Sequence, residues 1–147
     1  MRPLAKFWSL TRCEKKLLCE ASILLSLSNI CVKAIAFRHI ERFMRTSWTT
    51  DGTQDAINRK QESRLIKRSV SRAANVLPWK SLCLTRSITE FIMLRRRGIP
   101  AVMSAGVRFF GLSSLDAHAW VETNLEGKDK SSEKFTTVIR IGTGVCR

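Results

Sequence analysis

The sequence SLCLTRSITEFIMLRRRGIP, residues 81–100, holds a cysteine near its start and ends with three arginines, a glycine and a proline. Its apolar side chains recur at the spacing of one helix face: Leu84, Ile88, Phe91 and Ile92. This pattern predicts a helix over residues 82–97. The arginines suit the negative end of the helix dipole, and Gly98 and Pro100 end the helix. The stretch leaves open whether Cys83 is a small buried residue or a nucleophile.

The sequence after this helix changes character. Three segments rich in β-branched and aromatic residues, separated by turn-like sequences, predict three strands: residues 101–110, 117–123 and 135–141. Helices followed by a small sheet give an α+β fold class.

A long helical region is predicted near the N-terminus. Thr11 and Glu14 have the spacing of a capping box, which places a helix start at residue 12. Apolar residues continue to about residue 44 and surround much of the helix axis, so we expect one break and packing on the rest of the protein rather than attachment to a membrane. The longest uncharged stretch, residues 21–32, is too short and too polar for a membrane span.

The polar loop at residues 46–54 is the expected domain boundary. It separates an N-terminal helical extension, residues 1–50, from a core, residues 51–147. The core would open with a helix over residues 56–77 that has one apolar and one basic face.

Composition narrows the class of protein. The chain has 147 residues, 44% of them hydrophobic, which is enough to bury a core. Lys and Arg total 26 against 12 Asp and Glu, and the net charge of +14 favours an acidic partner such as nucleic acid, anionic lipid or an acidic peptide. Charge alone does not choose among these partners.

The five cysteines form no C-x-x-C pair. Their odd number and their spacing indicate neither a zinc cluster nor a disulfide framework, and reduced thiols are typical of a cytoplasmic protein. The N-terminus becomes charged at Glu14 and Lys15 before an apolar run develops, which argues against a secretory signal.

Cys83 falls in the first turn of its predicted helix. Unpaired backbone N–H groups and the helix dipole favour a thiolate there, and the same N–H groups could hold an oxyanion. A free cysteine is also often a simple buried side chain, so the residue alone supports both interpretations.

The chain has two histidines. His39 lies among charged residues of the first long helical region and is interpreted as an ordinary packing or surface residue. His118 lies in the strand-like segment DAHAWVE, where two-residue alternation puts it on the same side as Trp120 and Glu122. A helix-start cysteine followed by a strand histidine is the order of papain-like and transglutaminase-like thiol enzymes. A core histidine remains the alternative from these residues alone.

Two blocks together are more specific. LPWKSLCLTRSITEFIMLRRRGIPAVMSAGV, followed after a gap by DAHAWVE, resembles the transglutaminase-like peptidase of lasso-peptide biosynthesis. That family has a Pro-Trp, a Cys-Leu-x-Arg, a helix ending in arginines with Gly-Ile-Pro, and Ala-His-Ala-Trp-Val-Glu. The N-terminal sequence LTRCEKKLLCEASILLSLSNICVKAIAFRHIERFM also resembles the helical extension of the stand-alone form.

The resemblance implies a transglutaminase-like (papain-like) cysteine peptidase that removes the leader from a ribosomally made lasso precursor. Cys83 would attack the scissile carbonyl, His118 would take and return the proton, and the backbone N–H of Cys83 would bind the oxyanion. No metal or organic cofactor is implied. The implied partners are the leader region of the precursor, a separate small leader-recognition protein and an asparagine-synthetase-like macrolactam cyclase.

The third catalytic residue departs from the family pattern. The family has an aspartate about a dozen residues after the histidine, and Asp129 lies 11 residues after His118. If residues 124–127 formed a hairpin turn, however, the register would pair His118 with Glu133 and leave Asp129 near Glu122. Asp129 is the preferred candidate.

Two other functions stay open. A small nucleic-acid-binding protein is favoured by the basic charge and two adjacent basic helices, and it would bind in a salt-dependent way that ignores Cys83. A catalytically inactive scaffold of the lasso-peptide maturation complex would bind the cyclase without cleaving the precursor.

Overall fold

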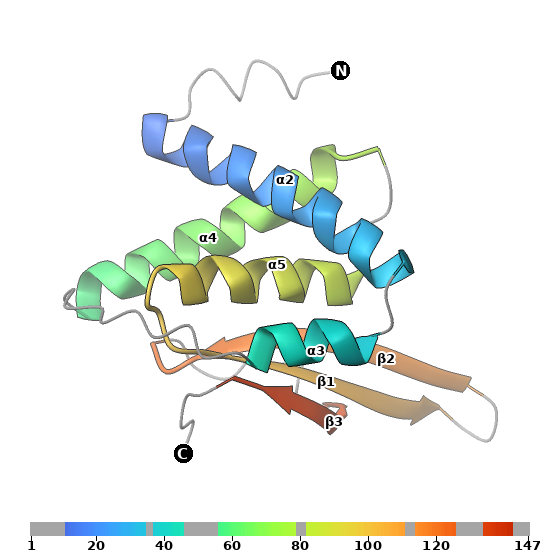
Figure 1. Ribbon diagram of the computed structural model, residues 1–147. Helices are drawn as coiled ribbons and strands as arrows, with labels where there is room; N and C mark the ends of the chain where they lie inside the picture. The colour runs from blue at the N-terminus through green and yellow to red at the C-terminus, as the bar shows by residue number, and fades with distance from the viewer. Residues whose placement is uncertain are drawn as a thin grey trace.

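The computed structural model describes residues 11–34, 37–45, 56–78, 82–110, 114–125 and 134–142. Within these ranges, helices precede strands: α2 Arg12–Ala34, α3 Phe37–Arg45, α4 Ala56–Val76, α5 Cys83–Arg96, β1 Ala101–Phe110, β2 Ser114–Thr123 and β3 Thr136–Ile141. Figure 1 shows α5 between the sheet and the pair formed by α2 and α4. The predicted α+β class and the order of the elements are confirmed.

The start of α2 is the predicted capping box. The backbone N–H of Thr11 donates to Glu14 Oε2 at 3.1 Å, and the N–H of Glu14 donates back to Thr11 Oγ1 at 3.3 Å. The Thr11 N–H, and after it the Thr11 hydroxyl, which also donates to Glu14 Oε2 at 3.1 Å, hold the pKa of Glu14 below its ordinary value. The predicted single break is also present, because α2 ends at Ala34 and α3 begins at Phe37.

One face of α2 is buried through Leu17, Ala21 and Leu25, at the spacing that packs a helix on its neighbours α4 and α5. By length and composition alone, α2 is long and apolar enough to cross a membrane. Of its most apolar 18-residue stretch, 28% is buried inside the protein. The prediction that residues 21–32 are too short for a membrane span is wrong on length, because the helix extends beyond this uncharged stretch to 23 residues. Core helices and signal sequences meet the same criterion.

The end of α5 follows the sequence prediction. Gly98 has φ 67°, the left-handed conformation that glycine adopts without steric cost. The N–H of Ile99 donates to Leu94 O at 3.0 Å, and that of Gly98 donates to Arg95 O at 3.0 Å. This pair of bonds closes the helix and turns the chain into β1.

Arg97 ties three helices together at that end. Its guanidinium binds Glu20 of α2 through Nη2, and its Nε binds Glu62 of α4 at 3.1 Å. Arg96 adds a 3.2 Å contact to Glu20. The side chain of Arg97 is 23% exposed, so its charge is partly removed from water and depends on both carboxylates.

The sheet has the order β2-β1-β3, with both pairings antiparallel. Met103 of β1 and Val121 of β2 lie opposite each other on the face that packs against Phe91 of α5. Alternation puts His118 and Trp120 on the other face.

The hairpin register considered for the third catalytic residue is contradicted for β3, whereas its pairing of His118 with Glu133 lies outside the described residues. It assumed that β2 pairs with the strand that follows it, but β1 lies between β2 and β3. His118 is opposite Gly106 of β1. The physical reason is that the long strand β1 can pair along both of its edges, which a register built from one turn cannot reveal.

Gly106 is a point of close approach. A Cβ at this position would lie 2.7 Å from the backbone oxygen of Thr136, 3.1 Å from Trp120 and 3.2 Å from Phe135. Glycine therefore allows β3 and two aromatic side chains to close over the centre of β1.

We expect Arg97→Ala to lower the free energy of unfolding by about 2 kcal/mol, because Glu62 loses its contact with Arg97 and Glu20 is left with the more exposed Arg96. The matched control is Arg45→Ala, which removes an exposed pair with Glu41 of α3 and should cost under about 0.5 kcal/mol. Urea unfolding measures both. Equal losses for the two variants would contradict the structural role of Arg97.

We expect Gly106→Ala to lower the free energy of unfolding by about 1–3 kcal/mol, because the added methyl meets a backbone oxygen rather than a flexible side chain. Thermal unfolding followed by circular dichroism tests this prediction. An unchanged melting temperature would show that β3 does not close over Gly106 as described.

Candidate active site

Cys83 is the first residue of α5, as the sequence predicted, and it is half-buried. The N-cap residue is Leu82, with an extended backbone (φ −66°, ψ 153°) and no side-chain capping hydrogen bond. Helix starts usually carry a Ser, Thr, Asp or Asn whose oxygen accepts a first-turn N–H. Leu82 has no such oxygen, so its side chain accepts none of the first-turn N–H groups beside the thiol.

The thiol lies against the rim of the sheet. Cys83 Sγ is 3.9 Å from the carbonyl oxygen of Ala117, as a weak S–H···O hydrogen bond. Ala117 immediately precedes His118 on β2, which is an edge strand of the described sheet. The fold thus brings Cys83 and the strand segment carrying His118 together from positions 34 residues apart.

The imidazole of His118 lies in an aromatic cluster. Its ring stacks on Trp120 with centroids 6.0 Å apart and planes 17° apart, and it meets the tilted ring of Phe135 at 5.2 Å. The predicted sharing of one face by His118 and Trp120 is confirmed. Arg108 lies over the Phe135 ring at 5.0 Å and binds Asp116 at 3.5 Å, so charged groups border this cluster.

A cavity of about 220 Å³ opens beside the thiol. The described residues that line it come from α4, α5 and β2: Lys67, Cys83, Arg86, Ser87, Glu90, Ala119, Trp120 and Val121. Trp120 borders this cavity and also stacks on His118, so the cavity and the aromatic cluster share a wall. The Nε1 donor of Trp120 is buried and has no hydrogen-bond partner among the described residues.

Charged groups line the same cavity. Lys67 Nζ lies 3.9 Å from Glu90 Oε1. Arg86 is the third charged residue among the described residues that line the cavity. Two cations against one carboxylate leave the described lining of the cavity with net positive charge. Lys67 was not identified from the sequence, because no local pattern relates a basic residue on α4 to a thiol on α5.

A larger cavity, about 690 Å³, lies among α2, α3 and α5. It is mostly apolar, and the described residues around it include His39 but neither Cys83 nor His118. Size therefore does not locate the chemistry in this fold. His39 remains apart from the thiol, as its position in the sequence suggested.

The two candidates for the third residue, Asp129 and Glu133, lie outside the described residues. The chain is described again from Lys134, and Phe135 then packs on His118. The contact of Phe135 with the imidazole was not predicted, because it depends on β3 pairing with β1. No group of three metal-ligating side chains occurs in the described ranges.

Comparison with known proteins gives one match. A family model described as Transglutaminase-like superfamily covers residues 28–140, which include Cys83, His118 and Asp129. The match begins within α2, ahead of the predicted boundary at residue 50. No curated protein and no solved structure matches the chain. The extent of the family match shows that the chain belongs to the transglutaminase-like superfamily, which includes cysteine peptidases.

Proposed function

We propose that this protein is a cysteine peptidase that removes the leader peptide from a lasso precursor and so enables macrolactam closure by a partner cyclase. The superfamily membership supports thiol chemistry, and the resemblance of residues 77–122 supports the lasso-precursor substrate. The observation that carries the proposal is the position of Cys83 Sγ, at a helix start and against the residue before His118.

In the proposed reaction, His118 takes the proton of the Cys83 thiol, and Sγ attacks the scissile carbonyl carbon of the precursor. The tetrahedral intermediate then collapses to a thioester with the leader. His118 donates its proton to the departing amine, which becomes the free N-terminus of the core peptide. Water, deprotonated by His118, hydrolyses the thioester and frees the leader.

The helix start favours the oxyanion of this intermediate. Backbone N–H groups of the first turn of α5 are donors fixed in place before the reaction, and the Leu82 side chain does not compete for them. The buried Nε1 of Trp120 is a further donor for a substrate carbonyl at the wall of the cavity.

β2 being an edge strand supports the proposed pairing of thiol and imidazole. Among the described strands β2 lies at the edge of the sheet, and its backbone meets Cys83 Sγ at Ala117, one residue before His118. We propose that Asp129 orients the imidazole, as the resemblance implies, with Glu133 as the alternative.

The proposed partners are those that the resemblance implies, and the small size of the site is compatible with them. A cavity of about 220 Å³ accommodates only a few side chains of a peptide, so a separate leader-recognition protein would supply most of the affinity for the leader. The precursor, this partner and the asparagine-synthetase-like cyclase would meet in the cytoplasm, where the cysteines stay reduced.

We expect Cys83→Ala and His118→Ala to abolish release of the leader, with a loss on the order of 10³-fold or more in rate. The measurement is mass spectrometry of a precursor encoded beside this protein, incubated with the recognition protein. Cys31→Ala, which changes another half-buried thiol, is the matched control and should keep wild-type activity.

Asp129→Ala and Glu133→Ala are compared in the same assay. The carboxylate whose loss slows cleavage more is the one that orients the imidazole of His118, and we expect this to be Asp129. Cleavage by Cys83→Ala at the wild-type rate would contradict the thiol mechanism. An intact precursor with wild-type protein, together with binding of the cyclase, would favour the scaffold instead.

A further inference from the structure

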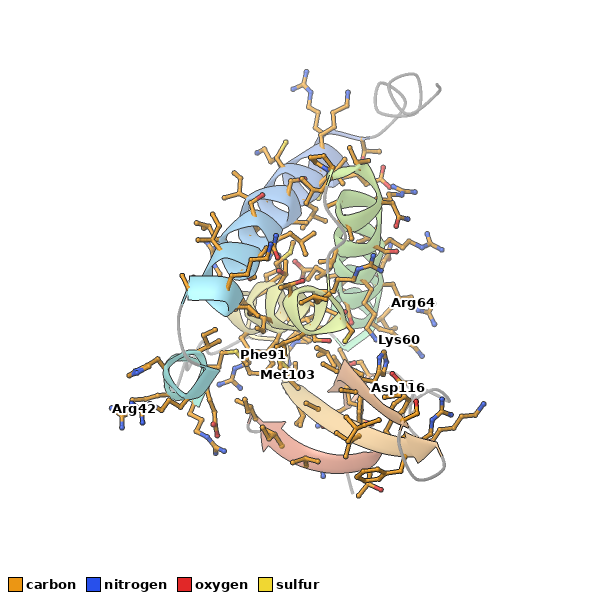
Figure 2. All side chains as sticks on the ribbon, turned by 90° about the vertical axis from the view of Figure 1, so that its right-hand side faces the viewer. Arg42, Lys60, Arg64, Phe91, Met103 and Asp116 are labelled. Carbon is orange, nitrogen blue, oxygen red and sulfur yellow. The ribbon has the colours of Figure 1, made fainter. Side chains whose placement is uncertain are left out.

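A basic row on α4 ends at the thiol cavity, which one of its residues lines. Lys60, Arg64 and Lys67 follow one another at intervals of four and three residues, which puts them along one flank of the helix. Lys60 and Arg64 are exposed, and Lys67 reaches the cavity of Cys83. In Figure 2, Lys60 and Arg64 of α4 and Asp116 of β2 lie on the same side of the molecule.

Arg86 extends the positive charge toward the thiol. It lies three residues after Cys83, so it occupies the next turn of α5 on the side that faces the cavity. Glu90, one turn further, is the one carboxylate among the described lining residues and lies near Lys67. Arg86 therefore places positive charge near the thiol, and Lys67 at the α4 wall shares its charge with Glu90, so the described lining as a whole is positive.

The opposite wall is suited to an extended peptide. Residues 114–117 of β2 are exposed on the edge strand, beside the point where Ala117 meets Cys83. An exposed edge can hydrogen-bond a peptide as an added strand. From Lys67 to Lys60 the helix rises about 10 Å, which an extended peptide covers in about three residues.

We propose that this cleft selects a peptide substrate with a carboxylate side chain within about four residues of the scissile bond. Lys67 and Arg86 bind that carboxylate, and Lys60 and Arg64 attract further acidic residues along the peptide. The inference rests on the proposed peptidase function and adds the charge of the substrate next to the cleavage site.

The size of the effect follows from the type of contact. A hydrogen bond between a cation and a carboxylate is about twice as strong as a neutral one, and it is stronger still in a partly buried cavity. Replacing the carboxylate by an amide of the same shape should lower kcat/KM about tenfold. Glu90 repels an incoming carboxylate, so Glu90→Gln should increase the preference for an acidic substrate.

The test uses full-length protein, the recognition protein and a neighbouring precursor made in two series. In one series, each Asp or Glu within four residues of the cleavage site is replaced by Asn or Gln; in the other, by Lys. We expect the Asn or Gln version at one position to be cleaved about tenfold more slowly by wild type. Lys67→Ala and Arg86→Ala should lose this discrimination, while Arg45→Ala, a distant arginine on α3, should keep it.

Charge reversal separates recognition from folding. Lys67→Glu should cleave the Lys version of the precursor faster than the acidic one, an exchange that a damaged fold would not produce. Equal cleavage of acidic and amide versions by wild type, or a precursor without a carboxylate near its cleavage site, would overturn this inference and leave the peptidase intact. If wild type cleaves no version, the proposed function fails and the inference with it.

Discussion

The contact between the start of α5 and the rim of β2 is the constraint on which the candidate site depends. Cys83 Sγ meets Ala117 O at 3.9 Å, and α5 packs on both β1 and β2. Phe91 and Leu94 anchor the helix in the core, and Arg97 ties its far end to α2 and α4. α5 is a continuous helix of 14 residues, so the contacts that hold its C-terminal end also help to fix the position of the thiol at its start.

The second half of the site is organised by the sheet. Gly106 leaves room for Trp120 and Phe135 to pack beside it, and both rings contact the imidazole of His118. Trp120 then joins this cluster to the charged cavity on the thiol side. The thiol, the imidazole and the charged groups of the cavity therefore come from three separate elements, α5, β2 and α4.

Much of the architecture could be predicted from local sequence. The capping box at Thr11, the helix stop at Gly98 and the alternation around His118 each follow from interactions within a few residues, and each was correct. Strand order could not be predicted in this way, because pairing of β1 with both neighbours is a long-range choice. For the same reason Lys67 and Phe135 were missed, and the third catalytic residue stays a prediction at Asp129.

The most direct test of the central claim, that His118 activates Cys83, is the rate at which each cysteine reacts with iodoacetamide near neutral pH, followed by peptide mapping. Cys13 and Cys19 are free and exposed, so they report the reactivity of ordinary thiols in the same molecule. The account predicts that Cys83 reacts fastest although it is half-buried, and that His118→Ala removes this advantage. A Cys83 that reacts more slowly than Cys13 and Cys19, unchanged by His118→Ala, would contradict it.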